Sequence, residues 1–375
     1  MRAGRGLLAA LALVLAAPGG LAAADPAAEA RAAAESLRAA GNLLSGAEEA
    51  KDRVAALTET VRAYEAGLAS LRAGLRRATI RERAIARGLE ARRQELGQLL
   101  GVMLGMERTP EALLLLHPSG PVGTARAGMM LGTVTPALQA EAEILRAELE
   151  EIATLRALQE AAAGALADGL AGVQTARTAL SQAVAERREL PRRFAASPDA
   201  LKSLLENSDT LDSFAAGLAR DSGQGPAEPG YALPPLPLPV NGTLLRGYGE
   251  TDAAGISRPG VVLATRPLAL VTAPAPATIL YRGPLLDYGN VIVLEPAPGI
   301  LMVFAGLAEV YGATGEVVPA GSPVGLMGGA APDAAAFLKA ATEGGGSSQP
   351  ETLYIEVREG DTPVDPAGLF ELDKD

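Results

Sequence analysis

The chain has no cysteine, no tryptophan and a single histidine, His117, among its 375 residues. Without cysteine it can form neither a disulfide nor a thiolate metal site. With one histidine, most zinc sites and most histidine-based acid–base chemistry are also excluded. The formal net charge of −11 disfavours non-specific binding to nucleic acid. The composition therefore argues against disulfides, against thiolate and most zinc sites, and against nucleic-acid binding.

The first 24 residues have the pattern of a secretory signal peptide. Arg2 and Arg5 precede an apolar stretch, 7–17, and small residues at 22–24 offer a cleavage site. The apolar stretch is shorter than the roughly 20 residues that a bilayer-spanning helix needs. The alternative interpretation is an uncleaved anchor or an alanine-rich helix. We expect export and a location in the periplasm.

Residues 25–190 are predicted to form a coiled-coil hairpin. In the first helix, expected over about 25–106, the apolar residues follow alternating steps of three and four. This run consists of Val54, Leu57, Val61, Tyr64, Leu68, Leu71 and Leu75. Proline and glycine then interrupt the pattern, which predicts a tip of short helices over 107–135.

A second long helix is predicted from about 136 to 190. Its apolar residues fit one heptad series: Leu145, Leu149, Ile152, Leu166, Leu170, Val173, Leu180 and Val184. Two long helices joined by a short break must bury these stripes against each other, so we expect an antiparallel pair. About 55 paired residues would make a rod of roughly 80 Å, which can connect or separate partners but forms no substrate pocket.

A further amphipathic helix is predicted within 191–221. Its apolar face consists of Leu201, Leu204, Leu205, Leu211, Phe214 and Leu218. This face must dock on the rod, on the following domain or on a partner. Residues 222–243 are rich in proline and glycine, and such a segment is an extended, semi-rigid linker.

Residues 244–375 have an all-β pattern, with short runs of valine, isoleucine and leucine bounded by glycine, proline and aspartate. The predicted fold class is therefore α+β and multidomain: a long antiparallel coiled-coil hairpin followed by an all-β domain.

Four motifs in the β-region resemble, in order, those of the LytM-type (lysostaphin-like) zinc metallopeptidase domain. They are Tyr288-Gly289-Asn290 before an apolar strand, the hairpin 299–307, the turn 317–325, and Leu353–Arg358 followed by Pro363-Val364-Asp365-Pro366. Together the motifs cover nearly all of 244–372. The resemblance implies an all-β LytM-like fold.

The zinc ligands of that family have no counterpart in this sequence. The positions of the H-x-G-x-D motif hold Arg258 and Val262, and the final-strand histidine is replaced by Tyr354. A hydrolytic zinc site needs three protein ligands and a water. We therefore predict no metal, no cofactor, no catalytic residue and no enzymatic activity.

A signal peptide, a coiled coil and a LytM domain without ligands together resemble the EnvC-like murein hydrolase activators. The resemblance implies a non-catalytic role in cell division, in which the domain binds and activates a periplasmic N-acetylmuramoyl-L-alanine amidase during daughter-cell separation. It also implies that an FtsE–FtsX-type transporter complex binds the coiled coil and that the 191–221 helix restrains the domain until then. The former active-site groove would bind the amidase through Arg258, Tyr288, Phe304, Tyr354 and Arg358.

Three other functions remain open at this stage. The chain could be an active murein endopeptidase, which the missing zinc ligands oppose. It could be a coiled-coil adaptor of a secretion or efflux system, although such adaptors carry β-structure on both sides of the hairpin. It could also be a structural spacer of the envelope. Direct binding of peptidoglycan by the β-domain is compatible with the main hypothesis.

Overall fold

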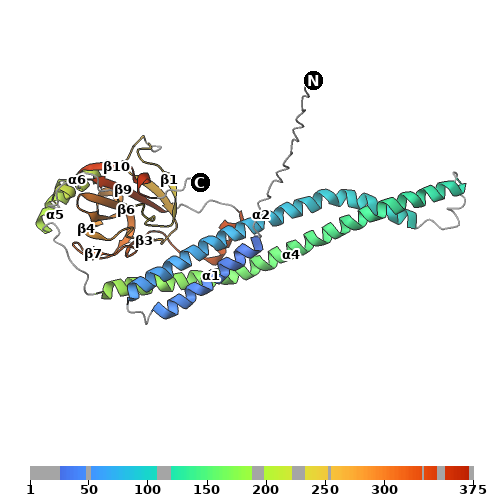
Figure 1. Ribbon diagram of the computed structural model, residues 1–375, viewed down its shortest axis with the longest axis horizontal. Coiled ribbons are helices and arrows are strands. Elements are labelled where there is room, and N and C mark those ends of the chain that lie inside the picture. Colours follow the sequence, from blue (N-terminus) through green and yellow to red (C-terminus); the bar gives the residue numbers. More distant parts are fainter. Residues whose placement is uncertain are drawn as a thin grey trace, which may run out of the picture.

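The computed structural model describes residues 26–47, 52–107, 120–187, 198–221, 233–251, 255–331, 333–343 and 351–370. A long helical rod projects from an antiparallel β-domain (Figure 1). This arrangement confirms the predicted fold class, α+β and multidomain. Among the described helices, none has the length and apolarity that a membrane-spanning segment requires. The predicted signal peptide, 1–24, and the single histidine, His117, lie outside the described residues.

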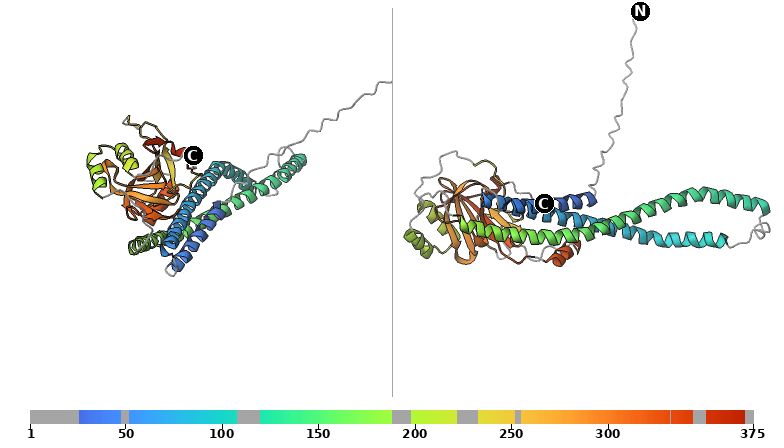
Figure 2. Two further views of the ribbon diagram at one scale, coloured as in Figure 1. Left: turned by 60° about the vertical axis from the view of Figure 1, so that its left-hand side comes forward. Right: turned by 90° about the horizontal axis from the view of Figure 1, so that it is seen from below.

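Three helices build the rod: α1 (Pro26–Ala47), α2 (Arg53–Glu107) and α4 (Gly120–Glu186). The prediction of one helix over 25–106 was wrong, because α1 folds back along α2 and also contacts α4. Asp52 explains where α2 begins, since its side chain accepts a hydrogen bond from the Ala55 amide at 3.0 Å and so caps the helix. Near the β-domain the rod is therefore a three-helix bundle, whereas the described part of its distal half consists of α2 and α4 (Figure 2).

The heptad series of the first long helix is confirmed, since Leu57, Val61, Leu71 and the other members are all buried. Small residues let α1 approach this seam closely. A Cβ added at Gly74 would lie 3.2 Å from the Cα of Ala30. The alanine-rich sequence of α1 therefore serves tight helix packing.

The predicted tip of short helices over 107–135 was also wrong in part, because α4 is continuous from Gly120 through Pro136. Pro136 is exposed, so water can hydrate the carbonyl that its missing N–H leaves unpaired. In the heptad series of α4, Ile152, Leu166 and Leu180 are buried, but Leu149 is 58% exposed. Ion pairs between α2 and α4 flank the seam, among them Arg81 with Glu151 at 2.6 Å and Arg156 with Glu82 at 2.8 Å.

The β-domain contains one ten-stranded antiparallel sheet that curls around its own core. Its strands are β1 (Gly242–Arg246), β2 (Val261–Thr265), β3 (Leu270–Thr272), β4 (Ala277–Pro284), β5 (Asn290–Ala297), β6 (Ile300–Val310), β7 (Val317–Val318), β8 (Pro323–Met327), β9 (Glu351–Glu359) and β10 (Thr362–Val364). The main strand order is β1-β2-β9-β6-β5-β4-β7, with β10 paired to β9 and β3 paired to β8. Strand β9 is thus central, between β2 and β6.

Two features of this domain differ from the sequence prediction. Leu236 and Val240, predicted to lie in the 222–243 linker, are buried in the β-domain core, and the Leu236 amide donates to the Leu369 carbonyl at 2.8 Å. A helix, α7 (Ala334–Glu343), follows β8 and packs against α2 and α4. The β-domain therefore starts earlier than predicted and is not purely β. Two 3-10 helices, η1 (Leu286–Tyr288) and η2 (Pro366–Gly368), complete it.

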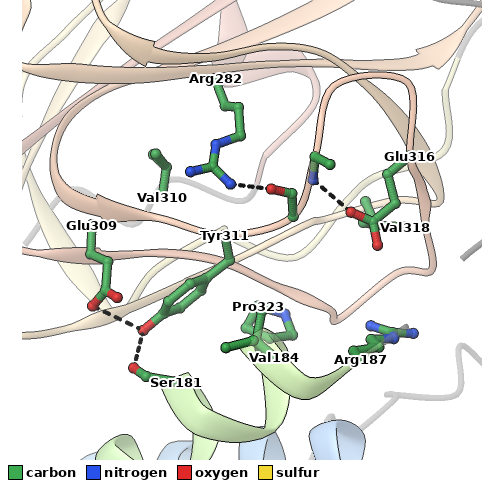
Figure 3. A pocket seen from close by; sticks show the side chains of 13 residues that line it. Ser181, Val184, Arg187, Arg282, Glu309, Val310, Tyr311, Glu316, Val318 and Pro323 are labelled. Atoms are coloured by element: carbon green, nitrogen blue, oxygen red, sulfur yellow. Dashed lines mark hydrogen bonds between the residues drawn. The ribbon is translucent and has the colours of Figure 1, made fainter. Parts of the chain in front are cut away.

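The rod and the β-domain share one hydrophobic core at their junction, to which Leu270, Leu326 and Phe337 contribute from the β-domain. Buried Glu65 of α2 accepts hydrogen bonds from Arg177 of α4 at 2.8 Å and from the Leu270 amide at 3.0 Å. At the end of α4, the hydroxyl groups of Ser181 and Tyr311 lie 2.9 Å apart (Figure 3). The base of the rod is therefore packed on the β-domain and not merely tethered to it.

Two short helices, α5 (Pro198–Asn207) and α6 (Leu211–Asp221), lie on the β-domain beside β4 (Figure 1). The prediction of one helix here was wrong, because the chain breaks at Ser208–Thr210 and starts again. Thr210 and Ser213 cap α6 reciprocally: the Ser213 amide donates to Thr210 Oγ1 at 3.1 Å, and the Thr210 amide donates to Ser213 Oγ at 3.2 Å. The break lets both helices turn apolar residues toward the sheet.

Candidate functional site

The face of the sheet that carries the former zinc-ligand positions is built by strands β2 and β9. In their antiparallel register, Val262 lies directly opposite Tyr354. Side chains alternate along a strand, so Tyr354, Glu356 and Arg358 project from the same face of β9. The intervening residues Leu353, Ile355 and Val357 point into the core on the other side.

Helix α6 covers this face. Leu211, Phe214, Ala215 and Leu218, spaced three and four apart on one side of the helix, are buried with Tyr281, Val303 and Tyr354. The rings of Phe214 and Tyr281 meet edge to face with centroids 4.8 Å apart. Leu201, Leu204 and Leu205 of α5 are partly buried against the same cluster. All six apolar residues predicted for this segment thus belong to one cluster with the β-domain, in which α5 packs on α6.

A continuous set of polar contacts runs across the covered face. Tyr354 Oη donates to Glu356 Oε2 at 2.7 Å, and Arg358 Nη1 donates to Glu356 Oε1 at 2.6 Å. The same Arg358 Nη1 donates to Asp212 Oδ1 of α6 at 2.6 Å. Arg358 Nη2 also donates to the carbonyl of Asp361. Arg358 is therefore held from three sides, and one of these contacts belongs to the covering helix.

Two further residues extend this set toward the rim. The ring of Tyr288 lies 6.3 Å from that of Tyr354, centroid to centroid. The guanidinium carbon of Arg258 lies 5.6 Å from the Tyr288 ring centroid, within the range of a cation–π interaction. The structure thus brings together Arg258, Tyr288, Tyr354 and Arg358, four of the five residues predicted to line the groove.

The prediction that the fifth residue, Phe304, lines the groove was wrong. Phe304 is fully buried and belongs to the core on the opposite side of the sheet. In the pairing of β6 with β9, Ala305 lies opposite Tyr354, whereas Phe304 lies opposite Ile355. Because the two faces of a strand alternate, Phe304 points away from the face that carries Tyr354.

Burial sets the protonation of this cluster. Desolvation raises the pKa of Glu356 above its usual value, while hydrogen bonds from Tyr354 and Arg358 oppose this rise. Burial, followed by the adjacent Glu356 carboxylate, raises the pKa of Tyr354, so its phenol is neutral at physiological pH. Burial alone would lower the pKa of Arg358, but Asp212 and Glu356 together raise it. In this cluster Arg358 is therefore a fixed cation, and Tyr354 is a hydroxyl donor.

The three former zinc-ligand positions do not fit a metal ion. Val262 offers no donor atom, and Arg258 is a permanent cation. Tyr354 directs its hydroxyl to Glu356 and keeps its proton. No group of three histidine, cysteine, aspartate or glutamate side chains with metal-site geometry occurs in the part of the chain that the structure describes.

Sequence reasoning missed Asp212 and Tyr281, and it assigned Glu356 only to a strand. Asp212 is the second residue of α6, where an acidic residue is expected simply from the helix dipole. Nothing in the local pattern pairs it with Arg358, which lies 146 positions further along the chain.

The comparisons with known proteins concern the β-domain. Residues 257–366 match the model of Peptidase family M23. An uncharacterized protein of Neisseria meningitidis serogroup B is 34% identical over 93 residues, which are 25% of this chain and only 15% of that protein. The chain thus spans far less than two thirds of that relative.

Two solved structures resemble part of this chain at low similarity. The catalytic domain of lysostaphin from Staphylococcus simulans has 21% identity and a TM-score of 0.27, over 34% of this chain and 91% of that one. A zinc-containing peptidase from Vibrio cholerae has 19% identity and a TM-score of 0.28, over 37% of this chain and 39% of that one. The family assignment therefore rests on the family model and on the strand positions described above: residues 257–366 form a Peptidase M23, LytM-type domain.

Proposed function

We propose that this protein is a non-catalytic activator of periplasmic peptidoglycan amidases in daughter-cell separation. The observation that carries the proposal is that the former active-site face lacks the zinc ligands and is covered by a helix. Its ligand positions hold Arg258, Val262 and Tyr354, and an amphipathic helix covers it. A face that has lost its metal ligands but keeps aromatic and arginine side chains has the composition of a protein-binding surface.

The docking of α6 supports autoinhibition of that surface. Complete burial of Leu211, Phe214 and Leu218 contributes about 1.5–3 kcal/mol for each side chain, before the cost of ordering the helix. An amidase that binds the same face must displace α6. Converting a population that is 1% open into one that is 99% open requires about 5.5 kcal/mol of differential binding. A second partner that favours the open state can provide part of this free energy.

The rod is the place where such a partner would act. The chain passes from the end of α4, Glu186, to the start of α5, Pro198, so movement of α4 can act directly on the covering helices. The distal half of α4 also exposes Ile144 and Leu149 to solvent. We assign this distal part of the rod to an FtsE–FtsX-type transporter complex, and the signal-peptide pattern supports a periplasmic location for this chain.

The test is dye release from labelled peptidoglycan by the chain 25–375, with and without a periplasmic amidase from the same organism. The Phe214→Glu variant would put a charge into the buried contact with Tyr281 and undock α6. We expect the wild-type chain to stimulate the amidase weakly and Phe214→Glu to stimulate it strongly. Neither protein should release dye alone.

Arg220→Gln is the matched control, because it changes the net charge by the same amount on the exposed side of the same helix. It should behave like wild type. Dye release by Phe214→Glu without amidase would identify an endopeptidase instead. Failure of every form to stimulate the amidase would favour an adaptor or a spacer.

A further inference from the structure

A small cavity lies between the rod and the β-domain, away from the face that α6 covers. Its volume is about 150 Å³. Its apolar walls come from both units: Leu68, Leu170 and Val173 from the rod, and Pro267, Ala269 and Phe337 from the β-domain. The helix that carries Phe337, α7, lies against α2 and α4 (Figure 2). The cavity therefore exists only while the rod is docked.

Three arginines border this apolar space, in a chain whose net charge is −11. Arg177 forms an ion pair with Glu65 at 2.8 Å, which also lines the cavity. The negative charge of the Glu65 carboxylate also acts on Arg266. The guanidinium carbon of Arg72 lies 5.8 Å from the Phe337 ring centroid, and Arg266 donates to the backbone carbonyl of Glu65 at 3.2 Å. Among the residues that line the cavity, three guanidinium groups thus accompany one carboxylate, that of Glu65.

Arg72 and Arg266 also repel each other. Burial lowers the pKa of Arg266, and the positive charge of Arg72 lowers it further, while the Glu65 carboxylate opposes both effects. One carboxylate does not balance three guanidinium groups, so a second anion between Arg72 and Arg266 would stabilise the junction. Arginine is suited to holding such an anion, because its planar donors can bind a carboxylate through two parallel hydrogen bonds.

We propose that this cavity is a binding site for a small carboxylate with a compact apolar body, held between Arg72 and Arg266. A cavity of about 150 Å³ accommodates an apolar body of about the size of benzene. The apolar walls take that body, and the two guanidinium groups take the carboxylate. Because its walls belong to both units, the ligand binds only the docked arrangement and stabilises it by linkage.

The experiment is calorimetric titration of the chain 25–375 with benzoate, with benzamide as the neutral analogue and inorganic phosphate as the anion without an apolar body. We expect benzoate to bind in a one-to-one ratio and more tightly than either control. Arg72→Gln and Arg266→Gln should each weaken benzoate binding roughly tenfold, the effect of losing one charge-assisted hydrogen bond.

Arg76→Gln is the matched control, one helical turn beyond Arg72 on the exposed side of α2, and should leave the affinity unchanged. Ala69→Leu would fill the cavity from α2 and should abolish binding, while circular dichroism verifies that it remains folded. The proposal is overturned if benzoate does not bind, if benzamide or phosphate binds as tightly, or if both glutamine variants retain wild-type affinity.

Discussion

Asp212 on α6 and Arg358 on β9 form an ion pair at 2.6 Å that joins the covering helix to the central strand of the sheet. The two side chains differ greatly in exposure, 61% for Asp212 and 1% for Arg358. Arg358 remains paired with Glu356 on its own strand even without Asp212. The contact can therefore break without leaving a buried charge alone, which suits a helix that has to leave the sheet.

Asp212→Ala should loosen α6 without unfolding the domain. An ion pair with one exposed partner contributes at most about 1 kcal/mol. We expect backbone amides of α6 to exchange with deuterium up to about fivefold faster. Hydrogen-exchange mass spectrometry would measure this change. Asp209→Ala, in the exposed turn before α6, is the control, and equal exchange in the two variants would refute the role given to Asp212.

Arg358→Met should destabilise the β-domain by about 3–5 kcal/mol, because it leaves Glu356 buried without its cation. Adding Glu356→Gln removes the unpaired charge while keeping an acceptor for the Tyr354 hydroxyl. The double variant should therefore recover most of the loss. Urea unfolding measures both free energies, and a double variant no more stable than Arg358→Met would show that charge burial is not the cause.

Gly260→Ala should destabilise the domain by about 1–3 kcal/mol. A Cβ added at Gly260 would lie 2.5 Å from the backbone carbonyl oxygen of Ile355 and 2.6 Å from the Tyr354 ring. Backbone cannot move aside as easily as the end of a side chain, so β2 and β9 must separate. Gly368→Ala is the control, since nothing lies within 4 Å of its added Cβ. Thermal unfolding should separate the two variants, and equal melting temperatures would contradict this explanation.

Tyr311→Phe should remove part of the alkaline sensitivity of the chain. Burial raises the pKa of Tyr311 from 10.0 to about 12. The folded chain therefore holds this proton more tightly than the unfolded chain, so the stabilisation is complete below pH 10.0 and is lost as pH rises through about 12. Wild type should lose stability faster than Tyr311→Phe across this interval in denaturant titrations.

Tyr248→Phe provides the comparison for that titration, because Tyr248 is 38% exposed and lies away from the rod junction. It should keep the wild-type alkaline profile. If Tyr311→Phe follows the same profile as Tyr248→Phe, the ionisation of Tyr311 does not contribute to stability in this range.

Much of the architecture could be predicted because it follows local periodicity. The heptad spacing from Val54 to Leu75 marks the seam of α2, and every member is buried. The continuation of α4 through Pro136 could not be predicted from spacing, because whether a proline ends a helix depends on its surroundings. Helix α1 was merged with α2 because its alanine-rich sequence contains neither a heptad series nor a strong break.

The sequence predicted most of the residues of the candidate site but not the face of the sheet on which each of them lies. Four of its five predicted residues come together. The prediction for Phe304 was wrong, because the pairing of β6 with β9 puts this side chain on the other face of the sheet. A one-residue difference in register reverses the orientation of a side chain, and the sequence of one strand does not specify its register with another.

The sequence by itself determined the types of residue available: long helices with apolar stripes, an M23-type β-domain, and ligand positions occupied by Arg258, Val262 and Tyr354. These are properties of residue identity and short-range spacing. Only the tertiary structure decided that α6 packs on the face that carries Tyr354, that Asp212 reaches Arg358, and that the rod packs on the β-domain around Glu65. Such contacts join residues far apart in the chain, and their free energy depends on burial and complementary shape that arise only after folding.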